Sequence, residues 1–91
     1  MENKEDIQFI YDLVAKRIKL FRRYRKITQE SLAEKIAYSR GYIGNIESAK
    51  TSQTFSLAFL YAIAKTLDVP LELFFKEDIS IELKKLGFEK D

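Results

Sequence analysis

Apolar residues recur every three or four positions through most of the sequence, which is the spacing of an amphipathic α-helix. The first such stripe consists of Ile7, Tyr11, Val14, Ile18 and Phe21. It predicts a long first helix over about residues 4–24. No segment alternates apolar and polar residues as a half-buried strand does, so we expect an all-α fold.

Two helix-capping residues then introduce two short apolar repeats. Thr28 and Ser39 carry hydroxyls that can accept a free backbone N–H at a helix start. They predict a second helix that ends near Ala37 and a third helix over about residues 40–48. Because only a few residues separate the two helices, they must cross steeply, as in a helix-turn-helix.

After a polar loop at residues 50–54, the apolar spacing predicts further helices. They cover about residues 57–67, 71–75 and 78–86. Ser56 is a suitable N-cap for the first, Pro70 suits the start of the second, and Gly87 suits the end of the third. The pattern thus predicts a bundle of five or six helices.

Length and composition limit the classes of protein that fit. A chain of 91 residues with 46% hydrophobic content suits one domain over residues 1–91. No apolar run is long enough to span a membrane, so we expect a cytoplasmic protein without a membrane partner. The absence of cysteine and histidine removes thiolate and imidazole ligands and the commonest general base. We therefore expect no metal site, no cofactor and no catalytic residues.

The net charge of +2 conceals an uneven distribution. Residues 16–50 carry ten Lys or Arg against three Glu, whereas residues 1–15 and 68–91 are both net acidic. A basic central block is typical of a polyanion-binding surface, because Lys and Arg displace the counterions condensed on phosphates. The same charges could equally form a solvated helix face.

The segment ITQESLAEKIAYSRGYIGNIE, residues 27–47, closely resembles the helix-turn-helix of the Cro and phage-repressor (XRE-like) family. The resemblance continues in LYAIAKTLDV, residues 60–69, and spans about residues 14–75. It implies a repressor-like DNA-binding bundle with a helical extension over about residues 78–91. Residues 39–44 are most similar to the recognition helix of restriction-modification controller proteins.

This resemblance implies a double-stranded DNA partner that is read by the third helix. The expected base-reading residues are Arg40, Tyr42 and Asn45. The Arg40 guanidinium can bond guanine O6 and N7, the Tyr42 ring can press on a thymine methyl, and Asn45 can bond adenine or a phosphate. Gly41, where many relatives carry a reader, has no side chain, so DNA shape contributes more to recognition.

Other positions are expected to contact phosphate or to support the fold. The expected phosphate contacts are Gln29, Lys35, Ser39, Lys50 and Thr51. Within the basic run over residues 16–26, one or two members such as Arg25 or Lys26 are expected to approach phosphate. Arg22 and Glu47 stand where the family places a structural salt bridge between the first and third helices.

The chain also departs from the family pattern. Ala37 and Ala49 replace glycines that usually follow the second and third helices, and an alanine forced to positive φ is strained by about 1–2 kcal/mol. The segment between Glu47 and Leu60 is about two residues longer than the common pattern and lacks its proline. Lys50 and Thr51 lie in this segment.

The aromatic content exceeds what one small core needs. We therefore expect some aromatic residues to form a homodimer interface, namely Phe55, Phe59, Phe74 and Phe75. A symmetric pair of recognition helices can read two half-sites about one DNA turn apart, which implies a palindromic operator. The sequence thus predicts a homodimeric transcription regulator, either repressor or activator.

An alternative function is a protein-interaction module of the antitoxin or anti-repressor kind, with DNA binding secondary. The acidic, amphipathic ends of the chain favour a protein partner bound through the termini. An enzyme is the weakest interpretation, because no paired-carboxylate motif or glycine-rich loop accompanies the absence of histidine and cysteine.

Overall fold

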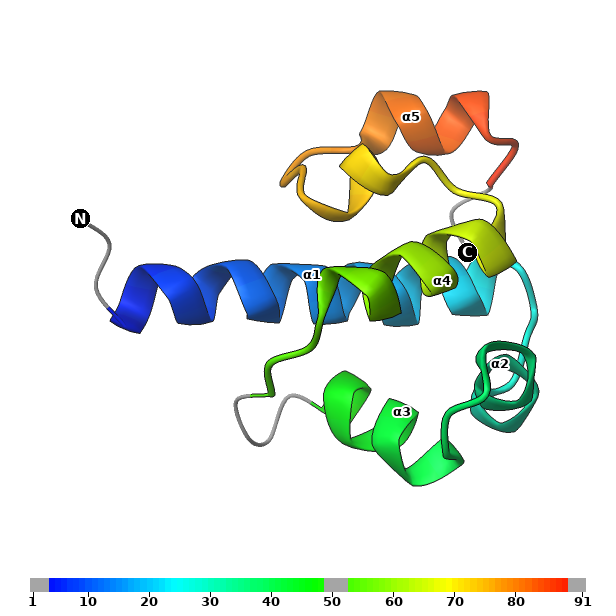
Figure 1. Cartoon of the computed structure of the whole chain (residues 1–91). Coiled ribbons are helices and arrows are strands. Elements are labelled where there is room, and N and C mark those ends of the chain that lie inside the picture. Colours follow the sequence, from blue (N-terminus) through cyan, green and yellow to red (C-terminus); the bar gives the residue numbers. More distant parts are fainter. Residues whose placement is uncertain (1–3, 49–52, 89–91) are drawn as a thin grey trace.

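The computed structural model describes residues 4–48 and 53–88, and all regular structure in them is helical (Figure 1). The elements are α1 (Lys4–Tyr24), α2 (Gln29–Ile36), α3 (Arg40–Ser48), α4 (Leu57–Leu67), the 3₁₀ helix η1 (Leu71–Phe74) and α5 (Ser80–Lys85). The predicted all-α fold is confirmed.

Capping side chains set the starts of the helices, as predicted. The Thr28 hydroxyl accepts a hydrogen bond from Ser31 N at 3.0 Å, and the Ser56 hydroxyl accepts one from Phe59 N at 3.0 Å. Tyr42 N donates to Ser39 Oγ at 3.1 Å in the same way. Each hydroxyl satisfies a backbone donor that the helix itself leaves free.

The expected fifth helix differs from the prediction, because η1 is a single 3₁₀ turn. It begins after Pro70, whose carbonyl accepts from Leu73 N at 3.1 Å. The two adjacent residues Leu73 and Phe74 are both buried. A short 3₁₀ turn is a common connector and here carries both side chains into the core. The sixth segment does form a helix, α5, and Gly87 follows it with φ 82°.

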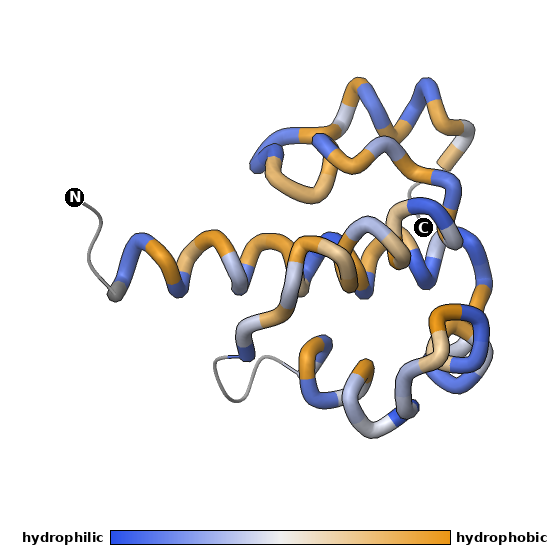
Figure 2. The backbone as a smooth tube through the Cα atoms, in the orientation of Figure 1, coloured by the Kyte–Doolittle hydropathy of each residue, from blue (hydrophilic) through white to orange (hydrophobic). Residues whose placement is uncertain are grey.

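Helix α1 runs through the middle of the molecule, with α2 and α3 on one side and η1 and α5 on the other (Figure 1). Hydrophobic positions recur along both α1 and α4 (Figure 2). The largest fully buried side chains are Phe21, Phe59, Phe74, Ile18, Leu32, Ile43, Ile63, Leu67 and Val14. Every helix from α1 to η1 contributes to this core, so α2 and α3 are packed directly on α1 and α4.

Two arginines, one in α1 and one directly after it, hold the C-terminal part of the chain. Arg17 donates to Lys76 O at 2.9 Å and to Glu77 O at 2.5 Å. Arg25 donates to Leu67 O at 2.7 Å and to the next carbonyl at 2.8 Å, and its guanidinium lies 4.6 Å from the ring centre of Phe88. Arg25 is one of the two residues named as able to approach phosphate, and its Nε and Nη2 are bonded to carbonyls within the fold.

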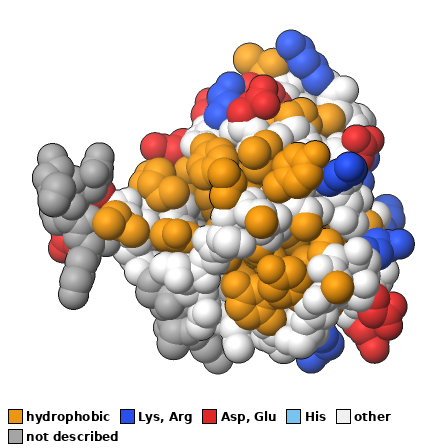
Figure 3. Space-filling model, in the orientation of Figure 1, with side chains coloured by type: hydrophobic (Ala, Val, Ile, Leu, Met, Phe, Trp, Pro, Cys, Tyr) orange, Lys and Arg blue, Asp and Glu red, His pale blue; other side chains and the backbone are white. Residues whose placement is uncertain are grey.

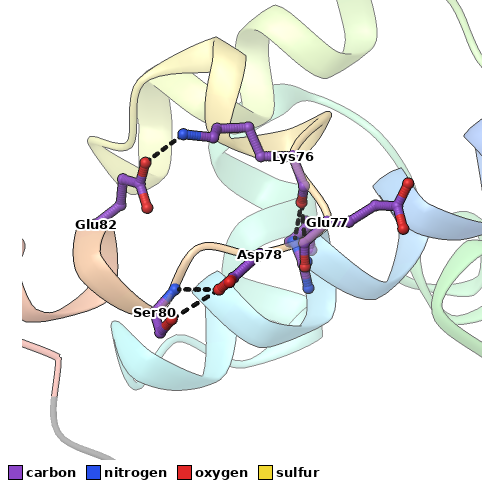
Figure 4. A network of polar contacts seen from close by, with 6 residues as sticks. Lys76, Glu77, Asp78, Ser80 and Glu82 are labelled. Atoms are coloured by element: carbon purple, nitrogen blue, oxygen red, sulfur yellow. Dashed lines mark hydrogen bonds and ion pairs between the residues drawn. The ribbon is translucent and has the colours of Figure 1, made fainter.

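A polar network completes this end of the molecule (Figure 4). Lys76 is paired with Glu82, and the Asp78 carboxylate accepts from both the hydroxyl and the backbone N–H of Ser80. The hydrogen bonds from Ser80 hold the pKa of Asp78 below its ordinary value, and the bond from Lys76 does the same to the pKa of Glu82. The network therefore favours charged carboxylates where the chain enters α5.

Ala37 ends α2 in a left-handed conformation, with φ 63° and ψ 41°. The predicted strain at this alanine is thus present, whereas Ala49 lies outside the described residues. We expect Ala37→Gly to raise the free energy of unfolding by about 0.5–1 kcal/mol, because glycine adopts positive φ without a Cβ clash. Urea denaturation monitored by circular dichroism measures the change.

Ala62→Gly in α4 provides the control for this substitution. Ala62 is at an ordinary interior helical position, where glycine costs about 1 kcal/mol relative to alanine. The two substitutions should therefore change stability in opposite directions. A loss of stability in both variants would contradict the proposed strain at Ala37.

Candidate nucleic-acid interface

The helices α2 and α3 form the predicted helix-turn-helix. In Figure 1 α2 is seen almost along its axis while α3 lies across the view, so the two cross steeply. Leu32 and Ala33 of α2 are buried, as are Ile43 and Ile46 of α3. The 2% exposure of Ala33 shows that the crossing leaves no room for a larger side chain.

A bidentate ion pair joins α3 to α1. Arg22 Nε lies 2.7 Å from Glu47 Oε2, and Arg22 Nη2 donates to Glu47 Oε1 at 2.8 Å. Arg22 Nη1 also donates to Ile27 O at 2.7 Å, in the segment between α1 and α2. The side chains are only 12% and 2% exposed, so both charges depend on this pairing.

Gln29 connects this ion pair to the first turn of α2. Its Nε2 donates to Glu47 Oε1 at 3.0 Å. A Cβ at Gly44 would lie 3.4 Å from the Gln29 side-chain oxygen, so Gly44 gives this side chain the space to lie against α3. Gln29 is consequently half-buried and held in place. The sequence did not reveal this role of Gly44, because only the packed helices place it opposite Gln29.

The outer face of α3 carries the expected base-reading residues in two different environments. Arg40 and Asn45 are exposed, and the position beside them at Gly41 opens to free space. Tyr42 is half-buried: its ring is stacked on Tyr38 with centroids 5.3 Å apart. Burial raises the pKa of Tyr42, with a smaller contribution from Tyr38.

Tyr42 also contacts the core, since its ring meets Phe59 edge-on with centroids 5.2 Å apart. Tyr38 meets the same Phe59 ring edge-on at 4.9 Å. These contacts leave less of the Tyr42 ring available for a base than the sequence suggested. Tyr38, at 42% exposure, was not identified from the sequence, although its aromatic type next to the Ser39 cap was a usable signal.

The expected phosphate-contacting residues are only partly described. Lys35 and Ser39 are exposed on the same helix-turn-helix as Gln29, and Ser39 also caps α3. Lys50 and Thr51 lie outside the described residues.

The predicted dimer interface requires a correction. Phe59 and Phe74 are 1% and 0% exposed, so they belong to the core and cannot contact a second copy. Phe55 is half-buried with its ring edge-on to Tyr11 at 4.9 Å, whereas Phe75 is 43% exposed. The sequence could not separate these four aromatics, because the tertiary packing decides which side of a helix they share.

A different apolar surface is exposed instead. Figure 3 shows hydrophobic side chains crowded on the face where α4 lies in front of α1. A groove of about 400 Å³ on this surface is lined by Asp6, Ile7, Ile10, Tyr11, Val14, Phe55, Ser56, Leu57, Leu60 and Phe75. The N-terminal half of α1 thus presents apolar residues beyond those needed for the core.

Among the described residues, none of the helices combines the length and apolarity that crossing a membrane requires. The same residues contain no group of three or more acidic, His or Cys side chains placed to hold a metal ion.

Comparison with known proteins agrees with this geometry. The model of the helix-turn-helix family matches residues 18–74, which is more than half of the chain. The immunity repressor protein of Bacillus phage phi105 is 38% identical over 82 residues, covering 86% of this chain. The matched region is 56% of that repressor, so this chain spans about half the length of the curated relative.

The ion pair gives a testable prediction about stability. Glu47→Ala leaves the Arg22 guanidinium buried without its partner, which we expect to lower the free energy of unfolding by about 3–5 kcal/mol. The double variant Arg22→Met, Glu47→Met removes both charges and should recover most of this loss. Urea denaturation measures the free energy of unfolding of the wild-type protein and of both variants. A double variant less stable than Glu47→Ala would contradict this account.

Proposed function

This chain belongs to the helix-turn-helix family of Cro and phage-repressor type, and we propose that it is a transcription regulator that binds a palindromic operator as a homodimer. The observation that carries this proposal is the exposed outer face of α3, fixed to α1 by the Arg22–Glu47 pair. A helix held rigidly in this way can enter the major groove as one unit. A DNA partner would place the protein in the cytoplasm.

In this proposal the first turns of α3 read base edges. Arg40 bonds guanine O6 and N7, and Asn45, about one turn further on, bonds adenine or a phosphate. Tyr42 offers only its outer ring edge to a thymine methyl, since Tyr38 and Phe59 contact the rest of the ring. Because Gly41 has no side chain, sequence-dependent DNA shape adds to the specificity.

Phosphate contacts set the register of the protein on the duplex. Gln29, Lys35 and Ser39 are the proposed contacts within the described residues, and Lys50 and Thr51 extend the set into the segment after α3. The narrower similarity to restriction-modification controllers remains a prediction.

The proposed dimer forms through the exposed apolar face of α1 and α4. Five large side chains are 42–67% exposed there: Ile7, Ile10, Leu57, Tyr61 and Phe75. At roughly 100 Å² each they offer about 500 Å² of apolar area. A standard interface buries about 800 Å² per partner, and about 65% of a homodimer interface is apolar. The face therefore has the size that a second copy of this chain needs.

Base reading and phosphate binding predict different mutant behaviour. Arg40→Ala should relax the preference at one base position of each half-site, with a loss of about 1–3 kcal/mol per half-site on the preferred DNA. Lys35→Ala should weaken binding to all sequences alike, because phosphates carry no base information. Selection from a randomised duplex library, followed by titration, measures both effects. If neither variant loses affinity or preference, the docking of α3 proposed here is wrong.

The dimer surface is tested by placing a charge in it. Leu57 and Ile81 are both 67% exposed, but only Leu57 lies at the groove between α1 and α4. We expect Leu57→Lys to convert the dimer to a monomer in light scattering after size exclusion, while Ile81→Lys on α5 leaves the mass unchanged. A dimeric Leu57→Lys protein would place the interface elsewhere, and a monomeric wild-type protein would contradict the homodimer itself.

A further inference from the structure

The basic residues in the second half of α1 and directly after it separate into two groups. Arg17, Arg22 and Arg25 use their guanidinium donors within the fold, on backbone carbonyls and on Glu47. Each of these arginines has a clear structural function in joining distant segments. Their positive charge therefore does not by itself indicate a ligand.

The second group is Lys16, Lys19 and Arg23, which we call the α1 basic stripe. Spacings of three and four residues place these side chains on one face of the helix. All three are exposed, and within residues 4–48 and 53–88 none of their side chains has a hydrogen bond or ion pair. Three unpaired cations on one helix face repel one another, which favours an anionic partner.

The stripe lies directly beside the C-terminal end of the recognition helix. A groove of about 370 Å³ is lined by Ala15, Lys16, Lys19, Leu20, Arg23, Glu47 and Ser48. Glu47 is the one acidic residue among them, and its carboxylate is 2% exposed and already bonded to Arg22 and Gln29. The surface offered to an approaching anion is therefore positive.

We propose that the α1 basic stripe binds the phosphodiester backbone of the same duplex whose major groove receives α3. This inference rests on the proposed function. The nine-residue α3 is about 14 Å long and the major groove is about 12 Å wide, so the end of the helix reaches the strand that borders the groove. Residues 16–23 extend over about 10 Å of α1, which is long enough to lie along neighbouring phosphates of that strand.

Backbone binding has a defined signature in salt dependence. Each lysine that contacts a phosphate contributes about 0.9 to the slope of log affinity against log salt, whatever the DNA sequence. The double variant Lys16→Gln, Lys19→Gln should therefore reduce this slope by about 1.8 for each bound protomer, or about 3.6 for the homodimer, and lower the affinity on the order of 10-fold per protomer at ~0.15 M salt. The loss should be equal on a selected, preferred duplex and on a random duplex of about 30 bp.

Helix α5 provides the matched control. Lys84→Gln, Lys85→Gln changes the net charge by the same amount, at two exposed positions on the opposite side of α1 from α3 (Figure 1). Fluorescence anisotropy of labelled duplex between about 0.05 and 0.3 M salt measures the slopes. We expect wild-type behaviour from this control. Arg23→Gln alone should reduce the slope by about 0.9 per bound protomer, or about 1.8 for the homodimer.

The outcomes separate the inference from the function on which it rests. If the wild-type protein prefers its selected duplex but the stripe variant keeps the full slope, the stripe does not bind the backbone and the regulator function stands. If both double variants lose slope equally, the effect is one of net charge and the inference is overturned. If the wild-type protein binds neither duplex, the proposed function and this inference both fail.

Discussion

The ion pair between Arg22 and Glu47 is the contact on which the arrangement of the helix-turn-helix depends. It joins α1 to the last turn of α3, while the same arginine holds the carbonyl of Ile27 and the same carboxylate accepts from Gln29 at the start of α2. Three helices thus meet at two nearly buried charges. Because neither charge can be left without its partner at low cost, the angle between α3 and the rest of the domain is fixed. In the proposed complex, a helix held in this way would meet DNA without first losing conformational entropy.

Helix α1 serves both the core and the surface because its faces differ in chemistry. Its buried face carries Ile18 and Phe21, and its arginines reach across to the ends of other elements. The family match begins at residue 18, so the N-terminal half of α1 lies before the matched region. This half exposes apolar residues such as Ile7 and Ile10. The family domain therefore explains the recognition helices, while the length of α1 supplies the additional surfaces.

The helix boundaries could be predicted from the sequence because local signals determine them. Thr28 and Ser56 cap their helices through contacts within three residues, and the apolar spacing identifies each buried face. The roles of Phe59 and Arg25 could not be predicted, because they depend on contacts between segments far apart in the chain. Phe59 was assigned to an interface but is buried under Tyr42. Arg25 was named only as a residue able to approach phosphate, and its bonds to carbonyls 42 and 43 residues away were not foreseen. The type of a side chain alone does not reveal which residues of other helices it will contact in the folded protein.

The most direct test is selection of genomic fragments by the purified protein, followed by titration of the recovered fragments against random duplex at about 150 mM salt. We predict recovery of one palindromic motif that is bound at least ~10³-fold more tightly than random DNA, as expected of specific recognition by a pair of fixed helices. Weak binding to every fragment, with a steep dependence on salt and no shared motif, would contradict the account, because it would show that the basic surface attracts DNA without reading it.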